Sequence, residues 1–154
     1  MRFGVVGKTI INQMEVPLGI LPGGSGTQRL PRLVGRGRAM EIVLGADALD
    51  AETAERWGYL NRIYDADQID AKVAALAARI ARFPAAAVRL AKASVNASDL
   101  PIQQGLQEEA YLFARLLRTE SAQHNMSQFL QIGGQTREGE LRVGELSAQL
   151  GEAD

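Results

Sequence analysis

The sequence predicts an α/β fold in which a short strand-and-turn unit is followed by a mostly helical body. Three observations predict it. Residues 4–13 are rich in β-branched side chains, a glycine-rich turn follows at residues 22–26, and apolar residues recur every three or four positions after residue 66. The predicted division therefore falls between residues 1–65 and residues 66–154.

Residues 4–13 are expected to form a strand that is interrupted near Gly7. Pro17 biases the preceding Val16 toward extended geometry, so Glu15 is expected to end an extended segment. The apolar run from Val5 to Ile11 predicts partner strands that this sequence does not contain, because a strand pair without further neighbours is marginally stable in water.

Turn and capping residues mark the elements that follow in the first part. Asp50 is the expected N-cap of one helix, and Pro31 either falls in the interior of another or splits it. The expected elements are a turn at 22–26, helices at 27–34, 38–44 and 51–57, and a brief strand at 60–64.

The second part shows the periodicity of amphipathic helices. Its clearest stripe runs from Ile69 to Phe83 in steps of four and three, and another runs from Ile102 to Leu117. These stripes are interpreted as core or subunit contacts. The expected helices span 67–83, a segment after Pro84, a segment after Pro101, and 121–132, with a weakly periodic docking tail at 136–150.

Composition narrows the functional classes. A length of 154 residues is that of one domain. The formal net charge of −1 provides no electrostatic field that would attract nucleic acid or an anionic membrane. The absence of cysteine excludes disulfides, thiol catalysis and cysteine-ligated metal. No apolar run approaches the roughly 18 residues of a membrane span. A cytoplasmic protein is therefore expected.

One carboxylate carries the most specific chemical signal. Glu15 precedes a Pro-Gly turn that opens a helix, and the free N–H groups of a helix start favour a bound hydroxide or enolate. A carboxylate near such groups can hold and move a proton. The alternative is a surface or turn-capping carboxylate. At this point Gly23 is interpreted as a glycine required by the turn.

Three stretches of sequence resemble the enoyl-CoA hydratase/isomerase (crotonase) family. In that family a Gln-x-Glu word precedes Pro-Gly, small residues and Thr-Gln-Arg-Leu, and later segments carry an Ala-Met-Glu helix and an Ala-Lys-x-x-Val-Asn helix. Here the corresponding words are QMEVPLGILPGGSGTQRL from Gln13, AMEIVLGADALDAETAERWGYLNRIYD from Ala39, and AKASVNAS with Lys92 and Asn96. The resemblance covers residues 2 to 130.

The resemblance implies a crotonase-like (ClpP/crotonase) fold, truncated to its C-terminal half. Residues 1–65 then form the C-terminal part of the β/α spiral core, and residues 66–154 form a helical oligomerisation region and tail. Glu15 is implied to be an acid/base carboxylate, and the N–H of Gly23 to hold the reacting water. The implied substrate is an acyl-CoA thioester, with no metal or redox cofactor and with coenzyme A present only as part of the substrate. The implied assembly is a trimer or dimer of trimers, with residues 84–132 forming much of the interface.

The same resemblance implies that other parts of the site lie outside these residues. In the family a second Glu follows a Gly-Gly-x-x-Glu word about twenty residues upstream, and the oxyanion-hole N–H groups lie in the same half. Met1 is therefore expected to be an internal methionine, and the chain alone to be nearly inactive, since losing one oxyanion donor costs about 10²–10³ in rate. Three functions stay open: a 2-enoyl-CoA hydratase, a Δ3,Δ2-enoyl-CoA isomerase that uses Glu15 alone, and a non-catalytic oligomerising fragment.

Other candidate sites are weaker. The glycines at 19–24 lack the lysine of a phosphate-binding loop, and His124 has no histidine or carboxylate partner at metal spacing. The arginines at 29, 32, 36 and 38 are interpreted as a solvated helix face or inter-subunit ion pairs rather than as ligands of CoA or RNA phosphates. After Met126 and Phe129 the sequence departs from the family's Glu-Lys-Arg cluster, so the CoA-binding residues stay unknown and Arg137 is only a weak substitute.

Overall fold

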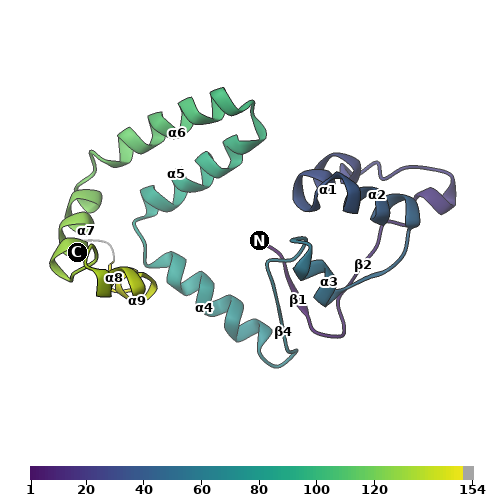
Figure 1. Cartoon of the computed structure of the whole chain (residues 1–154), viewed down its shortest axis with the longest axis horizontal. Coiled ribbons are helices and arrows are strands. Elements are labelled where there is room, and N and C mark those ends of the chain that lie inside the picture. Colours follow the sequence, from purple (N-terminus) through teal and green to yellow (C-terminus); the bar gives the residue numbers. More distant parts are fainter. Residues whose placement is uncertain (151–154) are drawn as a thin grey trace. The chain divides into compact units, whose positions relative to one another are not determined.

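In the computed structural model, which describes residues 1–150, fifteen short elements follow one another along the chain (Figure 1). Residues 151–154 of the predicted tail lie outside the described residues. Four strands are present: β1 Phe3–Val5, β2 Ile10–Ile11, β3 Leu49–Asp50 and β4 Arg62–Tyr64. The helices are α1 Gly26–Val34, α2 Arg36–Gly45, α3 Ala51–Arg56, α4 Ile69–Ala81, α5 Ala85–Asn96, α6 Ile102–Leu116, α7 Glu120–Gln131, α8 Arg137–Leu141 and α9 Val143–Ser147, with 3₁₀ turns at Val16–Leu18 and Ala97–Asp99.

The chain divides into two units, Met1–Ala75 and the part from Leu76 onward. The predicted boundary at residue 65 stays a prediction. Each unit has its own internal contacts.

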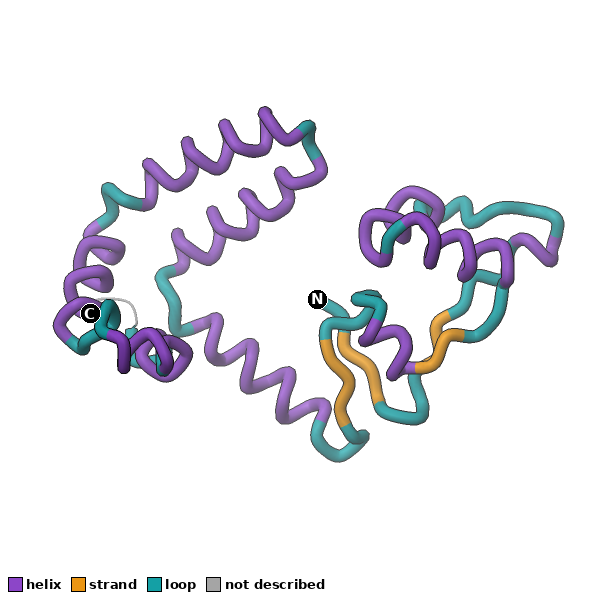
Figure 2. Tube along the Cα trace, in the orientation of Figure 1, coloured by secondary structure: helices purple, strands orange, loops and turns teal. Residues whose placement is uncertain are grey.

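The first unit contains two small pairs of strands (Figure 2). β1 runs parallel to β4, with Phe3 opposite Arg62, and β2 runs antiparallel to β3, with Ile11 opposite Leu49. Each of the two strands thus has one partner within this sequence, contrary to the expectation that it contains none, while further partner strands outside it stay a prediction. The partners are found far along the chain, where local sequence patterns do not reveal pairing.

The break between β1 and β2 falls at Gly7, as predicted, and this residue has a positive φ of 65°. Such a backbone conformation is readily adopted only by glycine. Gly4 makes a different kind of close approach, since a Cβ there would lie 2.7 Å from Leu60 Cδ1 and the Leu60 side chain would have to shift.

Helices α1 to α3 cover a small apolar core. Ile42 and Ala54 are 3% and 0% exposed, and Trp57 packs against this cluster. Its buried members are Leu30, Val34, Ala39, Ile42, Leu49, Ala54 and Leu60. The Asp50 carboxylate caps α3 as predicted by accepting a hydrogen bond from the Thr53 N–H at 2.7 Å.

The second unit is helical. α5 and α6 pack as a pair joined by the 3₁₀ turn at Ala97–Asp99, and both figures show them side by side (Figures 1 and 2). Thr119 caps α7 and Thr136 caps α8, each by accepting a backbone N–H on its hydroxyl. Arg79 of α4 donates to the Gly144 carbonyl at 3.2 Å, which ties α9 to α4.

The apolar stripe of α6 is largely unburied. Ile102 and Phe113 are 70% and 61% exposed, and only Leu112 among the α6 residues is buried. The stripe was interpreted as either a core contact or a subunit contact, and in the single chain it is not buried in the core.

Candidate functional site

The segment between β2 and α1 carries both predicted site residues. Pairing of β2 with β3 and a hydrogen bond from the Asn12 side chain to the Ala46 carbonyl, at 2.9 Å, fix its beginning. Its end is fixed where Gln13 meets α1, because a Cβ at Gly26 would lie 2.6 Å from Gln13 Oε1. A larger residue at position 26 would therefore force the end of the Gln13 side chain to move.

Glu15 does not end an extended segment, and that prediction was wrong. Its φ and ψ are −71° and −36°, and it is the N-cap residue of the 3₁₀ turn Val16–Leu18. Pro17 is tolerated inside the turn because the first helical positions need no N–H donor. The Glu15 carbonyl accepts hydrogen bonds from the N–H groups of Leu18 and Ile20, which closes this segment into a compact loop.

The Glu15 carboxylate is the unusual group of this segment. The residue is half-buried, and its Oε2 is shielded from solvent yet accepts no hydrogen bond from residues 1–150. Buried polar atoms are almost always paired, because leaving one unpaired costs about 1–3 kcal/mol. Glu15 Oε2 is therefore a buried acceptor whose hydrogen-bonding capacity is unused within residues 1–150, and such an atom calls for a functional explanation.

Gly23 lies in the turn before α1 rather than in its first helical turn. α1 begins at Gly26, after an N-cap Ser25 with a positive φ of 75° and no side-chain capping bond. At Gly23 itself, the φ is not in the left-handed region and an added Cβ would meet only the Leu21 carbonyl oxygen, at 4.0 Å. Neither backbone conformation nor local space therefore requires glycine there.

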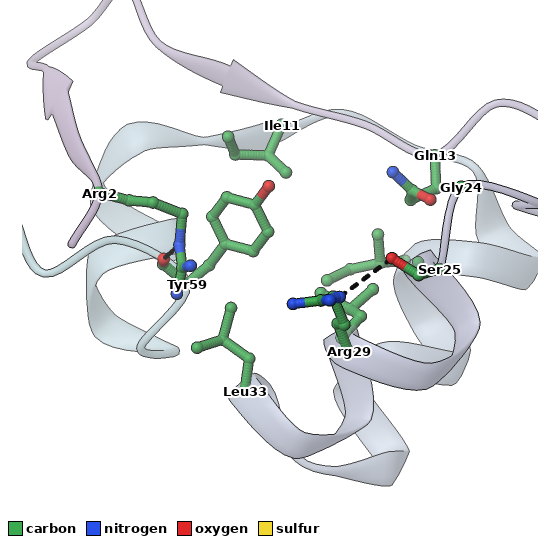
Figure 3. Close-up of a pocket in the computed structure, with 11 residues that line it drawn as sticks. Arg2, Ile11, Gln13, Gly24, Ser25, Arg29, Leu33 and Tyr59 are labelled. Atoms are coloured by element: carbon green, nitrogen blue, oxygen red, sulfur yellow. Dashed lines mark hydrogen bonds between the residues drawn. The ribbon is translucent and has the colours of Figure 1, made fainter. Parts of the chain in front are cut away.

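A cavity of about 210 Å³ lies beside this segment (Figure 3). Gln13 and Gly24 line it, whereas Glu15 and Gly23 do not. The structure therefore places the two predicted site residues on one loop but does not bring them together in this cavity. The second unit holds another cavity of about 490 Å³, which is lined mostly by apolar side chains of α5, α6 and α7.

The arginines of α1 and α2 make few contacts. Arg29 donates to Ser25 Oγ at 3.1 Å, Arg32 donates to the Gln28 carbonyl at 2.7 Å, and the guanidinium of Arg38 lies 5.3 Å from the Trp57 ring centroid. Both ion pairs within residues 1–150 involve Arg142, and the choice between a solvated helix face and inter-subunit ion pairs for the arginines of α1 and α2 stays a prediction.

Other candidate groups lie on exposed surface. Lys92 and Asn96 are exposed on α5, His124 on α7, and Arg137 at the start of α8. Within residues 1–150, no group of three His, Cys, Asp or Glu residues is arranged to hold a metal ion. The helices of that same part of the chain are all too short or too polar to cross a bilayer.

Sequence reasoning missed Arg2 and Tyr59, which line the first cavity together with Arg29. No local signal could have revealed this group, because its members are separated by 27 or more positions. Only the pairing of β1 with β4 brings Arg2 beside Tyr59, where the Arg2 Nε donates to the Tyr59 carbonyl at 2.7 Å.

Comparisons with known proteins agree on one family. The sequence model of the enoyl-CoA hydratase/isomerase family matches residues 5–135. A probable enoyl-CoA hydratase of Mycobacterium bovis is 38% identical over 120 residues, which are 77% of this chain and 47% of that protein. A crotonyl-CoA hydratase of Syntrophomonas wolfei is also 38% identical over 120 residues, 77% of this chain and 46% of that protein.

The fold agrees as well. The crystal structure of an enoyl-CoA hydratase from Bacillus anthracis superposes with a TM-score of 0.78 at 28% identity, covering 90% of this chain and 54% of that one. The chain spans about half the length of the curated relatives it matches. Its elements are thus those of the crotonase-type α/β fold over that span, and the chain belongs to the enoyl-CoA hydratase/isomerase family.

Proposed function

We propose that this chain supplies the acid/base carboxylate of an enzyme that adds water to 2-enoyl-CoA thioesters in fatty-acid or related acyl-CoA catabolism. The observation that carries the proposal is Glu15 Oε2, a solvent-shielded carboxylate oxygen without a hydrogen bond from residues 1–150. Family membership supports the same chemistry, as does the similarity to a protein named crotonyl-CoA hydratase.

In this reaction Glu15 is the proton carrier. The carboxylate accepts a proton from water as the water oxygen bonds to the β-carbon of the enoyl group and the C=C π bond breaks, and the Glu15 carboxyl group then gives this proton to the α-carbon. No electrons are lost or gained, so the reaction needs no redox cofactor; the proposal also includes no metal ion, and coenzyme A enters only as part of the substrate. General acid–base catalysis of this kind contributes about 10²–10⁴ in rate.

Gly23 is proposed to hold the reacting water through its backbone N–H. The support is that neither its φ nor the space around it requires glycine, so a side chain there would be excluded by the substrate or water rather than by the protein. The Pro22–Gly26 turn places this N–H on the same loop as Glu15.

The remaining groups of the reaction are proposed to come from polypeptide beyond these residues. The 154 residues contain no Gly-Gly-x-x-Glu word, so the second carboxylate and the N–H groups that stabilise the thioester enolate are assigned to that polypeptide. Stabilisation of such an oxyanion usually contributes more to the rate than any other single effect. We therefore expect the chain alone to be nearly inactive.

The test compares two isosteric substitutions in the protein as its native host produces it. Hydration of crotonyl-CoA is followed by the loss of the conjugated enoyl-thioester absorbance. Glu15→Gln is expected to lower kcat by about 10²–10⁴, while Glu41→Gln, an exposed carboxylate on α2, should leave kcat within twofold. Equal rates for Glu15→Gln and the wild type would refute the assignment.

A second candidate reaction is Δ3,Δ2-enoyl-CoA isomerisation. The observation that favours it is that Glu15 is the one carboxylate with a buried, unpartnered oxygen in residues 1–150, and a proton shuttle between two carbons needs only one carboxylate. Migration of the double bond of a 3-enoyl-CoA without formation of a hydroxyacyl product would select the isomerase.

We further propose a homo-oligomer, a trimer or dimer of trimers, in which residues 84–132 provide much of the contact. The exposed apolar stripe of α6 supports it, since Ile102 and Phe113 are 70% and 61% exposed. Sedimentation should show oligomers that Phe113→Glu dissociates. Oligomers that bind no CoA would instead favour a non-catalytic fragment. The predicted cytoplasmic location stays part of this proposal.

A further inference from the structure

The cavity of the first unit has an unbalanced charge. Arg2 and Arg29 line it, together with the polar side chains of Gln13 and Tyr59, and no Asp or Glu is among its lining residues. Figure 3 shows the two arginines on opposite sides of the Tyr59 ring. The lining therefore carries two positive charges and no negative charge.

Both guanidinium groups are held in place but are not saturated. Arg29 is anchored by the hydrogen bond from its Nε to Ser25 Oγ at 3.1 Å, and Arg2 by the bond from its Nε to the Tyr59 carbonyl at 2.7 Å. The Arg2 guanidinium also lies 5.3 Å from the Tyr59 ring centroid. The Nη groups of both residues donate no hydrogen bond to residues 1–150, and neither residue forms an ion pair there.

The walls of the cavity favour one kind of anion. Ile11, Leu30 and Leu33 supply apolar surface beside the guanidinium groups. A guanidinium group presents paired N–H donors that match two oxygens of a carboxylate or a phosphate, and the apolar walls beside them suit an anion that carries methylene groups better than a free phosphate. The volume of about 210 Å³ suits a short chain rather than a large ligand.

We propose that this cavity binds a carboxylate carried on a short apolar carbon chain, with Arg29 as the principal donor. Two sources share this chemistry. One is a free dicarboxylate, and the other is a 2-enoyl-CoA whose acyl chain ends in a second carboxylate. The second source rests on the proposed function. It is suggested by two lining residues that are close in sequence to the proposed catalytic residues: Gln13 is two positions before Glu15, and Gly24 follows Gly23.

The first experiment titrates the 154-residue chain with glutarate and follows backbone amide and arginine Nε–H signals by NMR. Saturable shifts are expected at Gly24, Gly26 and the Arg29 Nε–H. Arg29→Gln should weaken binding roughly tenfold, the scale of one charge-assisted hydrogen bond in a partly exposed site. Arg32→Gln is the matched control, because Arg32 lies on the same helix, donates to the Gln28 carbonyl and does not line the cavity.

Three results would overturn the carboxylate site. These are an absence of saturable shifts, equal binding of the neutral analogue glutaramide or of inorganic phosphate, and equal glutarate affinity in the Arg29→Gln and Arg32→Gln variants. The amide spectra of both variants show whether the fold is retained, and Arg29→Lys provides a second variant that keeps the charge but loses the paired donors.

The second experiment separates the two sources by comparing glutaryl-CoA with pentanoyl-CoA, which has the same chain length but no terminal carboxylate. Tighter binding of glutaryl-CoA than of glutarate, with a preference over pentanoyl-CoA that Arg29→Gln removes, identifies the acyl-borne carboxylate. Equal or tighter binding of glutarate identifies the free dicarboxylate. Glu15→Gln should leave glutarate binding unchanged, so a failure of the proposed hydration is distinguishable from a failure of this site.

Discussion

Truncation of Ile42 tests whether burial in the small core stabilises the first unit, which contains the loop that carries Glu15. Ile42 is 3% exposed and lies on α2, within the cluster that also contains Leu30 and Leu60. Removing a buried isoleucine to alanine costs about 2–5 kcal/mol, as the sum of lost burial and the cavity that remains. The unit of 75 residues, Met1–Ala75, is expected to have a free energy of unfolding of only about 4–11 kcal/mol.

The assay is urea unfolding followed by tryptophan fluorescence. Trp57 is the only tryptophan of the chain and packs against this cluster, so its emission reports the first unit. With a loss of about 3 kcal/mol and a slope of about 1 kcal/mol per M urea for so small a unit, Ile42→Ala should lower the midpoint by roughly 3 M. Ile42→Val should cost only about 0.5–1.5 kcal/mol.

Leu44→Ala is the matched control on the same helix. Leu44 is 62% exposed, so its truncation should change the free energy of unfolding by no more than about 0.5 kcal/mol. Equal midpoint shifts for Ile42→Ala and Leu44→Ala would refute the argument that burial in this cluster stabilises the unit.

Three further predictions concern single side chains. The pKa of Asp50 is lowered by hydrogen bonds from the hydroxyl and then the backbone N–H of Thr53, and also by the nearby charge of Arg56. The stabilisation that Asp50 gives is therefore present above the ordinary carboxyl pKa of about 4 and is lost as the pH falls through the lowered value. The difference in urea midpoint between the wild type and Asp50→Ala should shrink on acidification, and a constant difference would contradict this. Because Glu15 Oε2 is buried without a partner in residues 1–150, Glu15→Gln should keep or raise the thermal midpoint, and a large fall would indicate a structural role instead. Gly139→Ala should strongly destabilise the second unit in thermal unfolding, because the added Cβ would collide with the Gly133 carbonyl. Gly144→Ala is the control: an added Cβ there meets nothing within 4 Å, so this variant should be neutral or more stable by up to about 1 kcal/mol.

Local sequence signals predicted most of the helices. The helix expected at 27–34 spans Gly26–Val34, and the one after Asp50 spans Ala51–Arg56 with the predicted cap. Caps, terminal glycines and apolar periodicity act over only a few residues, so a single sequence contains them in full. Pro31 did not split its helix, because the core contacts of Leu30 and Val34 outweigh the loss of one N–H donor.

Features that depend on distant residues were not predictable in the same way. The partners of β1 and β2 lie at Arg62–Tyr64 and Leu49–Asp50, and the cavity between Arg2, Arg29 and Tyr59 forms only after these pairings. The turn conformation of Glu15 was also missed, because the preference of Val16 for extended geometry before Pro17 is weaker than the hydrogen bonds that the Glu15 carbonyl accepts at the 3₁₀ turn.

The parallel pairing of β1 with β4 has a kinetic consequence. Phe3 must find Arg62, and a hydrogen bond from the Arg2 N–H to the Asn61 side chain spans 59 positions. Closing a loop of that length costs about 3.6 kcal/mol of free energy through lost chain entropy, before the contacts of the strand pair can offset it. Helical hairpins such as α5 with α6 need no such closure. We therefore expect refolding to be biphasic, with helix formation complete before the slower emission change of Trp57.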